Sequence, residues 1–261
     1  MKIGFIAIVG TASLVASADA GFNGFVALAK QQGGNVIVDI YTAVGNASDK
    51  FLNVYNLNGS TTAAGGFFQA TGLANKTWKP DAANFNSTRN SVDSFMTAGT
   101  YSGAAYGGEF YASTNTTGDP NFTGTTWNAT PASPAATTIP ANAGWYTADP
   151  TSVDNGAQLL APLAVGYTRF DTGATAASGG TAGSAGSAGS LYGIWVSHLV
   201  IAGTLNSNLM TSLISWSGSA SIKDGVSGAT TQAISTFAAI PAPGALALLG
   251  VAGFASRRRR A

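Results

Sequence analysis

The 261-residue chain contains no cysteine and one histidine, and charged residues make up only 9% of it. Without cysteine there is no disulfide framework, so the folded part depends on its own hydrophobic core. One histidine and no cysteine also exclude the usual zinc ligand sets. A histidine-based triad would have to use His198, yet no Gly-x-Ser-x-Gly elbow occurs in the sequence.

The two side chains best suited to acid–base chemistry do not form a recognisable catalytic set. His198 lies in the apolar segment 191–201, which favours a packed or half-exposed strand residue over a general base. Glu109, the single glutamate, precedes Phe110 and Tyr111. A glycosidase would pair it with an aspartate about 5–10 Å away, and the sequence does not indicate such a pair. We therefore expect a non-enzymatic protein, with a secreted hydrolase as the weakest alternative.

Residues 1–20 have the order of a secretory signal peptide. Lys2 supplies the positive start, residues 3–15 form the apolar region, and Ala18-Asp19-Ala20 has the small-x-small pattern of a cleavage site. We expect signal peptidase to cut after Ala20. The alternative is an uncleaved N-terminal anchor.

The C-terminal segment 238–261 has three parts in a fixed order. Pro241, Ala242, Pro243 and Gly244 come first and favour extended backbone. An apolar run follows at 245–255, shorter than the roughly 20 residues that span a bilayer. A basic cluster closes the segment, formed by Arg257, Arg258, Arg259 and Arg260. The positive-inside rule keeps such a cluster in the cytoplasm, so we expect a transmembrane helix that acts as a brief membrane stop.

This tail resembles the PEP-CTERM sorting signal of Gram-negative and planctomycete-type bacteria. Pro241-Ala242-Pro243 stands where that family has Pro-Glu-Pro, and the resemblance covers about a tenth of the chain. It implies transient membrane anchoring, cleavage by an exosortase-type membrane protease, and release to the cell surface or an extracellular matrix that contains exopolysaccharide. The alternative is an ordinary tail anchor with a basic stop-transfer cluster.

Four short segments of the body are also similar to secreted planctomycete-type proteins that carry this tail. They are 51–55, 93–97, 118–122 and 143–146. None is a catalytic motif. The similarity implies an exported β domain.

Outside the two ends the charge balance changes sign. Residues 21–240 hold seven Lys and Arg against ten Asp and Glu, a net charge of −3. The middle of the chain therefore suggests neither nucleic acid nor an anionic membrane surface as a partner.

The body, 21–237, is predicted to be a single all-β domain, a β-sandwich of jelly-roll type. Segment 35–44 alternates most clearly, with residues 36, 38, 40, 42 and 44 on one face. The turn residues 45–49 predict an antiparallel hairpin with 50–57. In that second strand, one face is predicted to hold Phe51, Asn53, Tyr55 and Leu57, and the other Leu52 and Val54.

Further strands are predicted at 66–70, 91–98, 107–113, 158–170 and 191–201. Pro162 makes 158–170 an edge or bulged strand. Segment 208–217 fits a helix or a strand, and the residues after it slightly favour strand. Loops are predicted at 76–90 and 115–150, and 172–190 is a flexible, Gly/Ser/Ala-rich loop.

Aromatic residues in the predicted loops are candidate ligand contacts, namely Trp127, Trp145 and Tyr146. They would stack on sugars in a carbohydrate-binding module, whereas aromatic residues that cover a sandwich end are commoner. Asp119, Asp149 and Asp154 lie among turn residues, where aspartate usually bonds the local backbone. The alternative there is a loop calcium site. No other cofactor is predicted.

Overall fold

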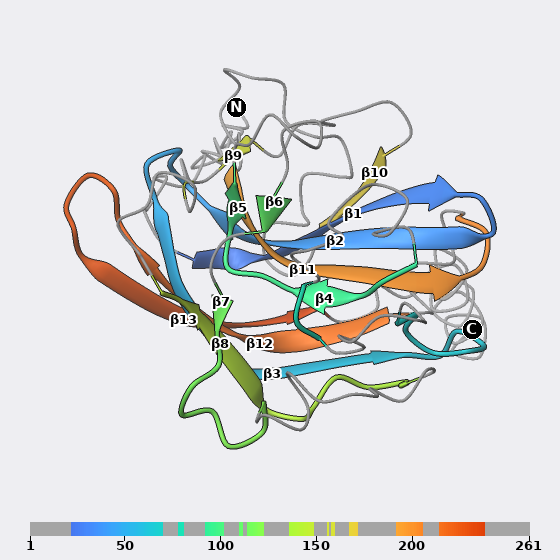
Figure 1. Ribbon diagram of the computed structural model, residues 1–261. Helices are drawn as coiled ribbons and strands as arrows, with labels where there is room; N and C mark the ends of the chain where they lie inside the picture. Colours follow the sequence, from blue (N-terminus) through green and yellow to red (C-terminus); the bar gives the residue numbers. More distant parts are fainter. Residues whose placement is uncertain are drawn as a thin grey trace, which may run out of the picture.

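The computed structural model consists of β-strands and connecting segments (Figure 1). It describes residues 22–69, 78–80, 92–101, 110–111, 114–122, 136–148, 156, 158–159, 167–171, 192–205 and 214–237. No helix in these ranges is long and apolar enough to cross a membrane. The predicted signal peptide, 1–20, the glycine-rich loop, 172–190, and the sorting tail, 238–261, all lie outside the described residues.

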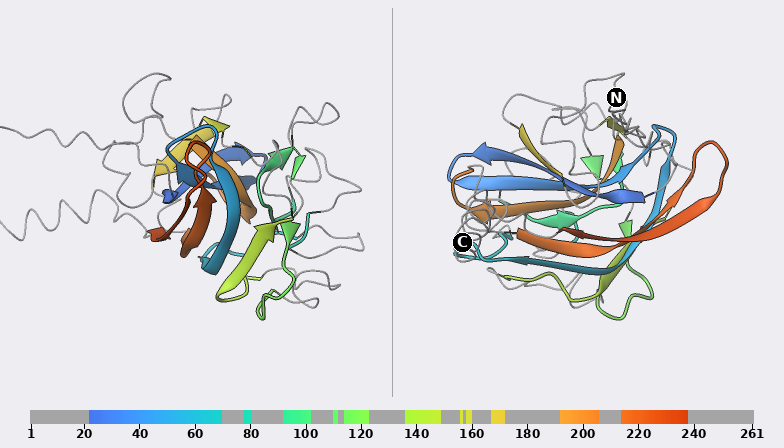
Figure 2. Two further views of the ribbon diagram at one scale, coloured as in Figure 1. Left: turned by 90° about the vertical axis from the view of Figure 1, so that its left-hand side faces the viewer. Right: turned by 180° about the vertical axis from the view of Figure 1, so that it is seen from behind.

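Two antiparallel sheets form the two layers of a sandwich-like body, as expected from the sequence (Figures 1 and 2). Sheet A has the order β10-β1-β2-β11-β4, and β9 also pairs with β11. Its strands are β1 (Phe22–Gln32), β2 (Asn35–Val44), β4 (Phe95–Met96), β9 (Gln158–Leu159), β10 (Tyr167–Asp171) and β11 (Tyr192–Ala202).

Sheet B has the order β13-β12-β3-β8-β7. Its strands are β3 (Lys50–Thr61), β7 (Thr114–Asn115), β8 (Ala143–Thr147), β12 (Ile214–Lys223) and β13 (Thr230–Phe237). A separate short pair is formed by β5 (Thr100–Tyr101) and β6 (Phe110–Tyr111).

The main hydrophobic core lies between the facing sides of the two sheets. Sheet A contributes residues such as Phe25, Val38, Ile40, Leu199 and Ile201, and sheet B contributes Phe51, Val54, Leu57, Trp145, Trp216 and Ile222. Burial of this apolar surface is the dominant stabilising term in a chain without disulfides.

The sequence-predicted hairpin between 35–44 and 50–57 is wrong. β2 pairs with β1 and β11, whereas β3 pairs with β12 and β8 in the other sheet. Nine of the ten residues of β2 are buried, so both of its faces are covered and it takes a central place in sheet A. The turn 45–49 therefore carries the chain from one sheet to the other.

The predicted faces of β3 are also wrong, because two β-bulges interrupt its alternation. The register with β12 shifts between the pairs Asn53–Ser221 and Phe51–Ile222, and again between Asn58–Ser217 and Tyr55–Ser219. Each bulge inserts an extra residue on β3 and moves the following side chains to the other face. As a result, Phe51, Val54 and Leu57 are all buried in the core.

Several other predictions are confirmed. The strand at 35–44 has the observed bounds of β2, and 191–201 corresponds to β11. The described parts of segment 158–170 lie in two strands, β9 and β10, and β10 is at the edge of sheet A among the described strands; Pro162 itself lies outside the described residues. The ambiguous segment 208–217 ends in β12, which begins at Ile214 and continues through Gly218 to Lys223.

Other predictions are wrong or incomplete. Residues 66–70 form no strand in their described part, and Phe67 makes only isolated bridges. The predicted strand 91–98 is reduced to β4, whereas the described residues of the predicted strand 107–113 both lie in β6. The predicted loop 115–150 contains β8. β1 and β13 were not predicted.

Two turns at one end of the molecule are joined by a buried carboxylate. Asp49 Oδ1 accepts a hydrogen bond from the backbone N–H of Gly225 at 3.1 Å, and Oδ2 accepts one from Asn46 at 3.2 Å. Burial raises the pKa of Asp49 above its usual value of 3.8, and the charge of Asp224 adds to the rise, while the two backbone hydrogen bonds oppose it. The pKa of Asp224 is instead lowered, by hydrogen bonds from the Ser227 hydroxyl and from the Val226 and Ser227 amides.

These opposite shifts predict opposite pH dependences. Ionised Asp224 stabilises the folded state above pH 3.8, and this contribution is lost as pH falls through its lowered folded pKa. Asp224→Asn should therefore have a lower free energy of unfolding than wild type at pH 7, and the difference should shrink towards pH 2.

Ionised Asp49 is disfavoured by burial, so the free energy of unfolding of Asp49→Asn should rise relative to that of wild type as pH rises from 3 to 7. Urea unfolding at each pH measures the stability difference between each variant and wild type. If the two differences change in the same direction as pH rises, the assignments are wrong.

Candidate functional site

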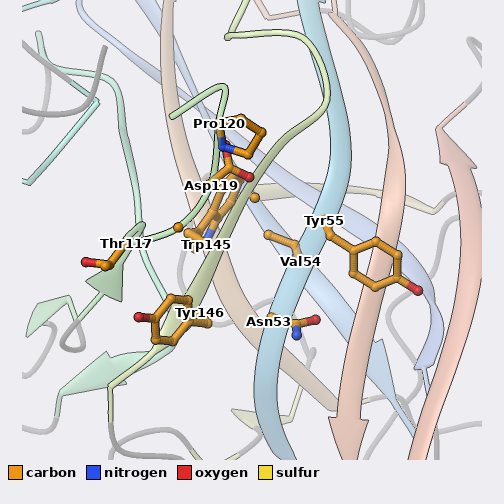
Figure 3. A pocket seen from close by; sticks show the side chains of 10 residues that line it. Asn53, Val54, Tyr55, Thr117, Asp119, Pro120, Trp145 and Tyr146 are labelled. Carbon is orange, nitrogen blue, oxygen red and sulfur yellow. The ribbon is translucent and has the colours of Figure 1, made fainter. Parts of the chain in front are cut away.

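An open cleft on the outer face of sheet B is a candidate site among the described residues. It has a volume of about 470 Å³ and lies between β3, β8 and the turn at 117–120. Figure 3 shows Tyr146 and Tyr55 to either side of Asn53, with Asp119 and Pro120 above them. The lining residues are Asn53, Val54, Tyr55, Thr117, Gly118, Asp119, Pro120, Gly144, Trp145 and Tyr146.

The cleft unites three of the four segments that prompted the similarity of the body to secreted proteins. These are 51–55 on β3, 118–122 in the turn, and 143–146 on β8. They are far apart in the sequence and meet because β3 pairs with β8. The fourth segment, 93–97, includes β4 in sheet A.

Gly144 forms part of the cleft wall and leaves room for the turn. A Cβ atom at this position would lie 2.9 Å from both Asp119 Oδ2 and the Val54 carbonyl oxygen. A Cβ atom does not come this close to another heavy atom unless one of the two groups shifts. Glycine at 144 therefore allows the Asp119 carboxylate to pack directly on β8.

Asp119 shapes the turn by bonding its own backbone. Its Oδ1 accepts hydrogen bonds from the amides of Asn121 at 2.8 Å and Phe122 at 2.6 Å. The buried Phe122 ring then packs 5.9 Å from the ring of Trp145. This is the turn-forming role expected for aspartate in such a segment. Asp149 and Asp154 lie outside the described residues.

A second set of contacts ties the turn to β3. The Asn142 amide donates to Asn58 Oδ1 at 3.1 Å, and Asn121 Nδ2 donates to the Asn142 carbonyl at 3.2 Å. Asn142 has a φ of +57°, a left-handed conformation that asparagine adopts more readily than most residues. The turn that bounds the cleft is therefore linked to β3 through Asn121 and Asn142.

The three residues predicted as ligand contacts lie in different environments. Trp145 is not a loop residue: it lies in β8, is 1% exposed, and donates its indole N–H to the Thr97 carbonyl at 2.7 Å. Its ring belongs to the core and cannot stack on a ligand in this conformation. Tyr146, the next residue, is half-buried and lines the cleft. Trp127 lies outside the described residues.

The cleft has little charge. Among the described residues that line it, Asp119 is the one carboxylic acid, and none is a lysine or arginine. Within the described ranges, no group of three or more His, Cys, Asp or Glu side chains could hold a metal ion. Glu109 is outside these ranges.

A buried Asp–His pair lies on the outer face of sheet A. His198 Nδ1 is 2.6 Å from Asp39 Oδ1, and the two residues are directly paired across β11 and β2. The His198 ring stacks on Phe95 with centroids 4.7 Å apart and meets the Trp195 ring edge-on at 5.9 Å. The sequence predicted His198 as a packed or half-exposed strand residue, and the structure shows the packed alternative, but the sequence gave no indication of Asp39 as its partner.

We expect the Asp39–His198 pair to stabilise the sheet as a unit. Asp39→Leu and His198→Leu should each lower the free energy of unfolding by about 2–4 kcal/mol, because each leaves a buried polar partner. The double variant should lose less than the sum of the two, by about 1–3 kcal/mol. Urea unfolding of all four proteins measures the coupling, and strictly additive losses would show that the contact contributes nothing.

Comparison with known proteins adds no assignment to this geometry. No family model matches the chain, and neither curated proteins nor solved structures give a significant match.

Proposed function

We propose that this chain is a non-enzymatic exported protein of the bacterial cell surface or extracellular matrix, where it associates with exopolysaccharide. Signal peptidase removes residues 1–20, and an exosortase-type protease processes the tail after its transient anchoring in the membrane. The body is then displayed as a β-sandwich of jelly-roll type.

The observation that carries this proposal is the ordered C-terminal segment, Pro241 to Arg260, combined with the signal-peptide pattern at the start. A basic cluster directly after a short apolar run is typical of membrane topology rather than of phosphate binding. The two-sheet body is compatible with export because its stability comes from a hydrophobic core and needs no disulfide.

A carbohydrate-binding module is the second candidate, favoured by the cleft on sheet B. Tyr146 lies in the cleft wall, as expected for an aromatic ligand contact, and Tyr55 is a further lining tyrosine. Trp145 cannot be one of the loop aromatic residues that contact a sugar, because it lies in the core. Both candidates place the protein among polysaccharides, and they differ in whether the body itself binds them.

The processed mass tests the sorting proposal. Protein purified from its native host should lack both residues 1–20 and the cluster Arg257–Arg260, because each end is cut during export. Intact-mass spectrometry measures this directly, and a variant with the four arginines replaced by serine serves as the control that should not be held and processed. Mature wild-type protein that retains all four arginines would exclude exosortase cleavage.

A further inference from the structure

The outer face of sheet B carries a series of hydroxyl and amide side chains, of which Ser219 and Ser221 are covered, with exposed fractions of 2% and 1%. On β12, Ile214, Trp216, Ala220 and Ile222 point into the core. Alternation along the strand puts the intervening residues on the opposite face. These are Ser215, Ser217, Ser219 and Ser221, a serine at every second position.

Strand β3 extends this surface in register. Its residues paired with the four serines are Ser60, Asn58, Tyr55 and Asn53, in that order. The two bulges of β3 make this possible, because they hold the apolar residues in the core while the polar ones face outward. Figure 3 shows the Tyr55 ring extending from β3 toward β12.

One row of paired residues crosses four neighbouring strands and passes through the cleft. Ser221 on β12 pairs with Asn53 on β3, Asn53 pairs with Tyr146 on β8, and Tyr146 pairs with Asn115 on β7. Neighbouring strands are about 4.8 Å apart. The row thus repeats a hydrogen-bonding side chain at a spacing close to the length of a sugar ring.

Two buried polar atoms at the β12 end of this row have no hydrogen-bond partner. They are Ser221 Oγ, in a residue that is 1% exposed, and Asn53 Oδ1, in a residue that lines the cleft. Buried polar atoms are normally paired, and an unpaired one costs free energy. Both atoms are covered in this conformation, so the accessible part of the row is formed by the half-buried residues Asn53, Tyr146 and Asn115.

The charge and the aromatic residues of the site limit the class of ligand. None of the described residues lining the cleft is a cation, and the Asp119 carboxylate bonds its own turn and packs on Gly144. An anionic polymer would meet no countercharge here. Tyr55 and Tyr146 instead combine an apolar ring with a hydroxyl, which suits the C–H faces and hydroxyls of a neutral sugar.

We propose that the cleft side of this face is a binding platform for a neutral polysaccharide, which lies across the strands along the row Asn53–Tyr146–Asn115. The platform deepens the proposed association with exopolysaccharide and rests on it for its biological context. Its contacts are the strand residues of sheet B, not the loop aromatics.

Affinity electrophoresis of the full-length protein tests the platform, with hydroxyethylcellulose, dextran or galactomannan in the gel and alginate as the anionic comparison. We expect retardation by at least one neutral polymer and none by alginate. Tyr146→Ala should weaken the binding about tenfold through loss of the aromatic contact. Thr117→Arg should block the cleft without disturbing the core, because Thr117 is exposed at its edge.

The matched control is Val226→Arg, which adds the same charge at a residue that is 76% exposed and lies outside the cleft. It should bind like wild type. No retardation by any neutral polymer, retardation by alginate alone, or unchanged binding of Thr117→Arg would each overturn the platform. Such a result would leave the sorting proposal standing if the mature protein lacks Arg257–Arg260, so the two proposals fail separately.

Discussion

Strand β3 must bury an apolar side chain at three positions spaced by three residues, and a regular strand cannot do this. Phe51, Val54 and Leu57 all belong to the core, while strict alternation would turn Val54 away from the other two. The two bulges opposite β12 resolve the conflict. Asn56, with a φ of +52°, lies in the second bulge and takes a left-handed conformation that asparagine tolerates.

The arrangement of the candidate site follows from this constraint. With its apolar residues buried, β3 presents Asn53 and Tyr55 on the outer face, opposite the serines of β12. On its other side β3 pairs with β8, whose Trp145 is fixed in the core by packing and by the hydrogen bond to Thr97. That fixed ring determines the direction of its neighbours, so Gly144 and Tyr146 face the cleft.

Regular alternation made part of the fold predictable from the sequence. It correctly located β2 and β11, and the edge position predicted for segment 158–170 agrees with the place of β10 in sheet A. The same rule failed at β3, because a bulge leaves no simple signal in the sequence. It also misjudged the partner of β2, since the turn 45–49 has hairpin-forming residues but connects two different sheets.

The site was less predictable than the fold, because its residues come together through long-range pairing. The sequence marked Tyr146 and Asp119 as noteworthy, but treated 115–150 as one long loop and therefore could not place Trp145 in β8. The role of Gly144 depends on how closely Asp119 approaches it. The partner of His198 likewise became visible only when β2 and β11 were paired.

The absence of native cysteine allows a direct test of the bulged strand. Single cysteines placed at Phe51, Asn53, Val54, Tyr55 and Leu57 can be labelled with a water-soluble maleimide under native conditions. The structure predicts slow labelling at positions 51, 54 and 57 and fast labelling at positions 53 and 55. Similar labelling rates at 51, 53, 55 and 57, with a different rate at 54, would show that β3 is regular and would contradict both the core and the platform described for sheet B.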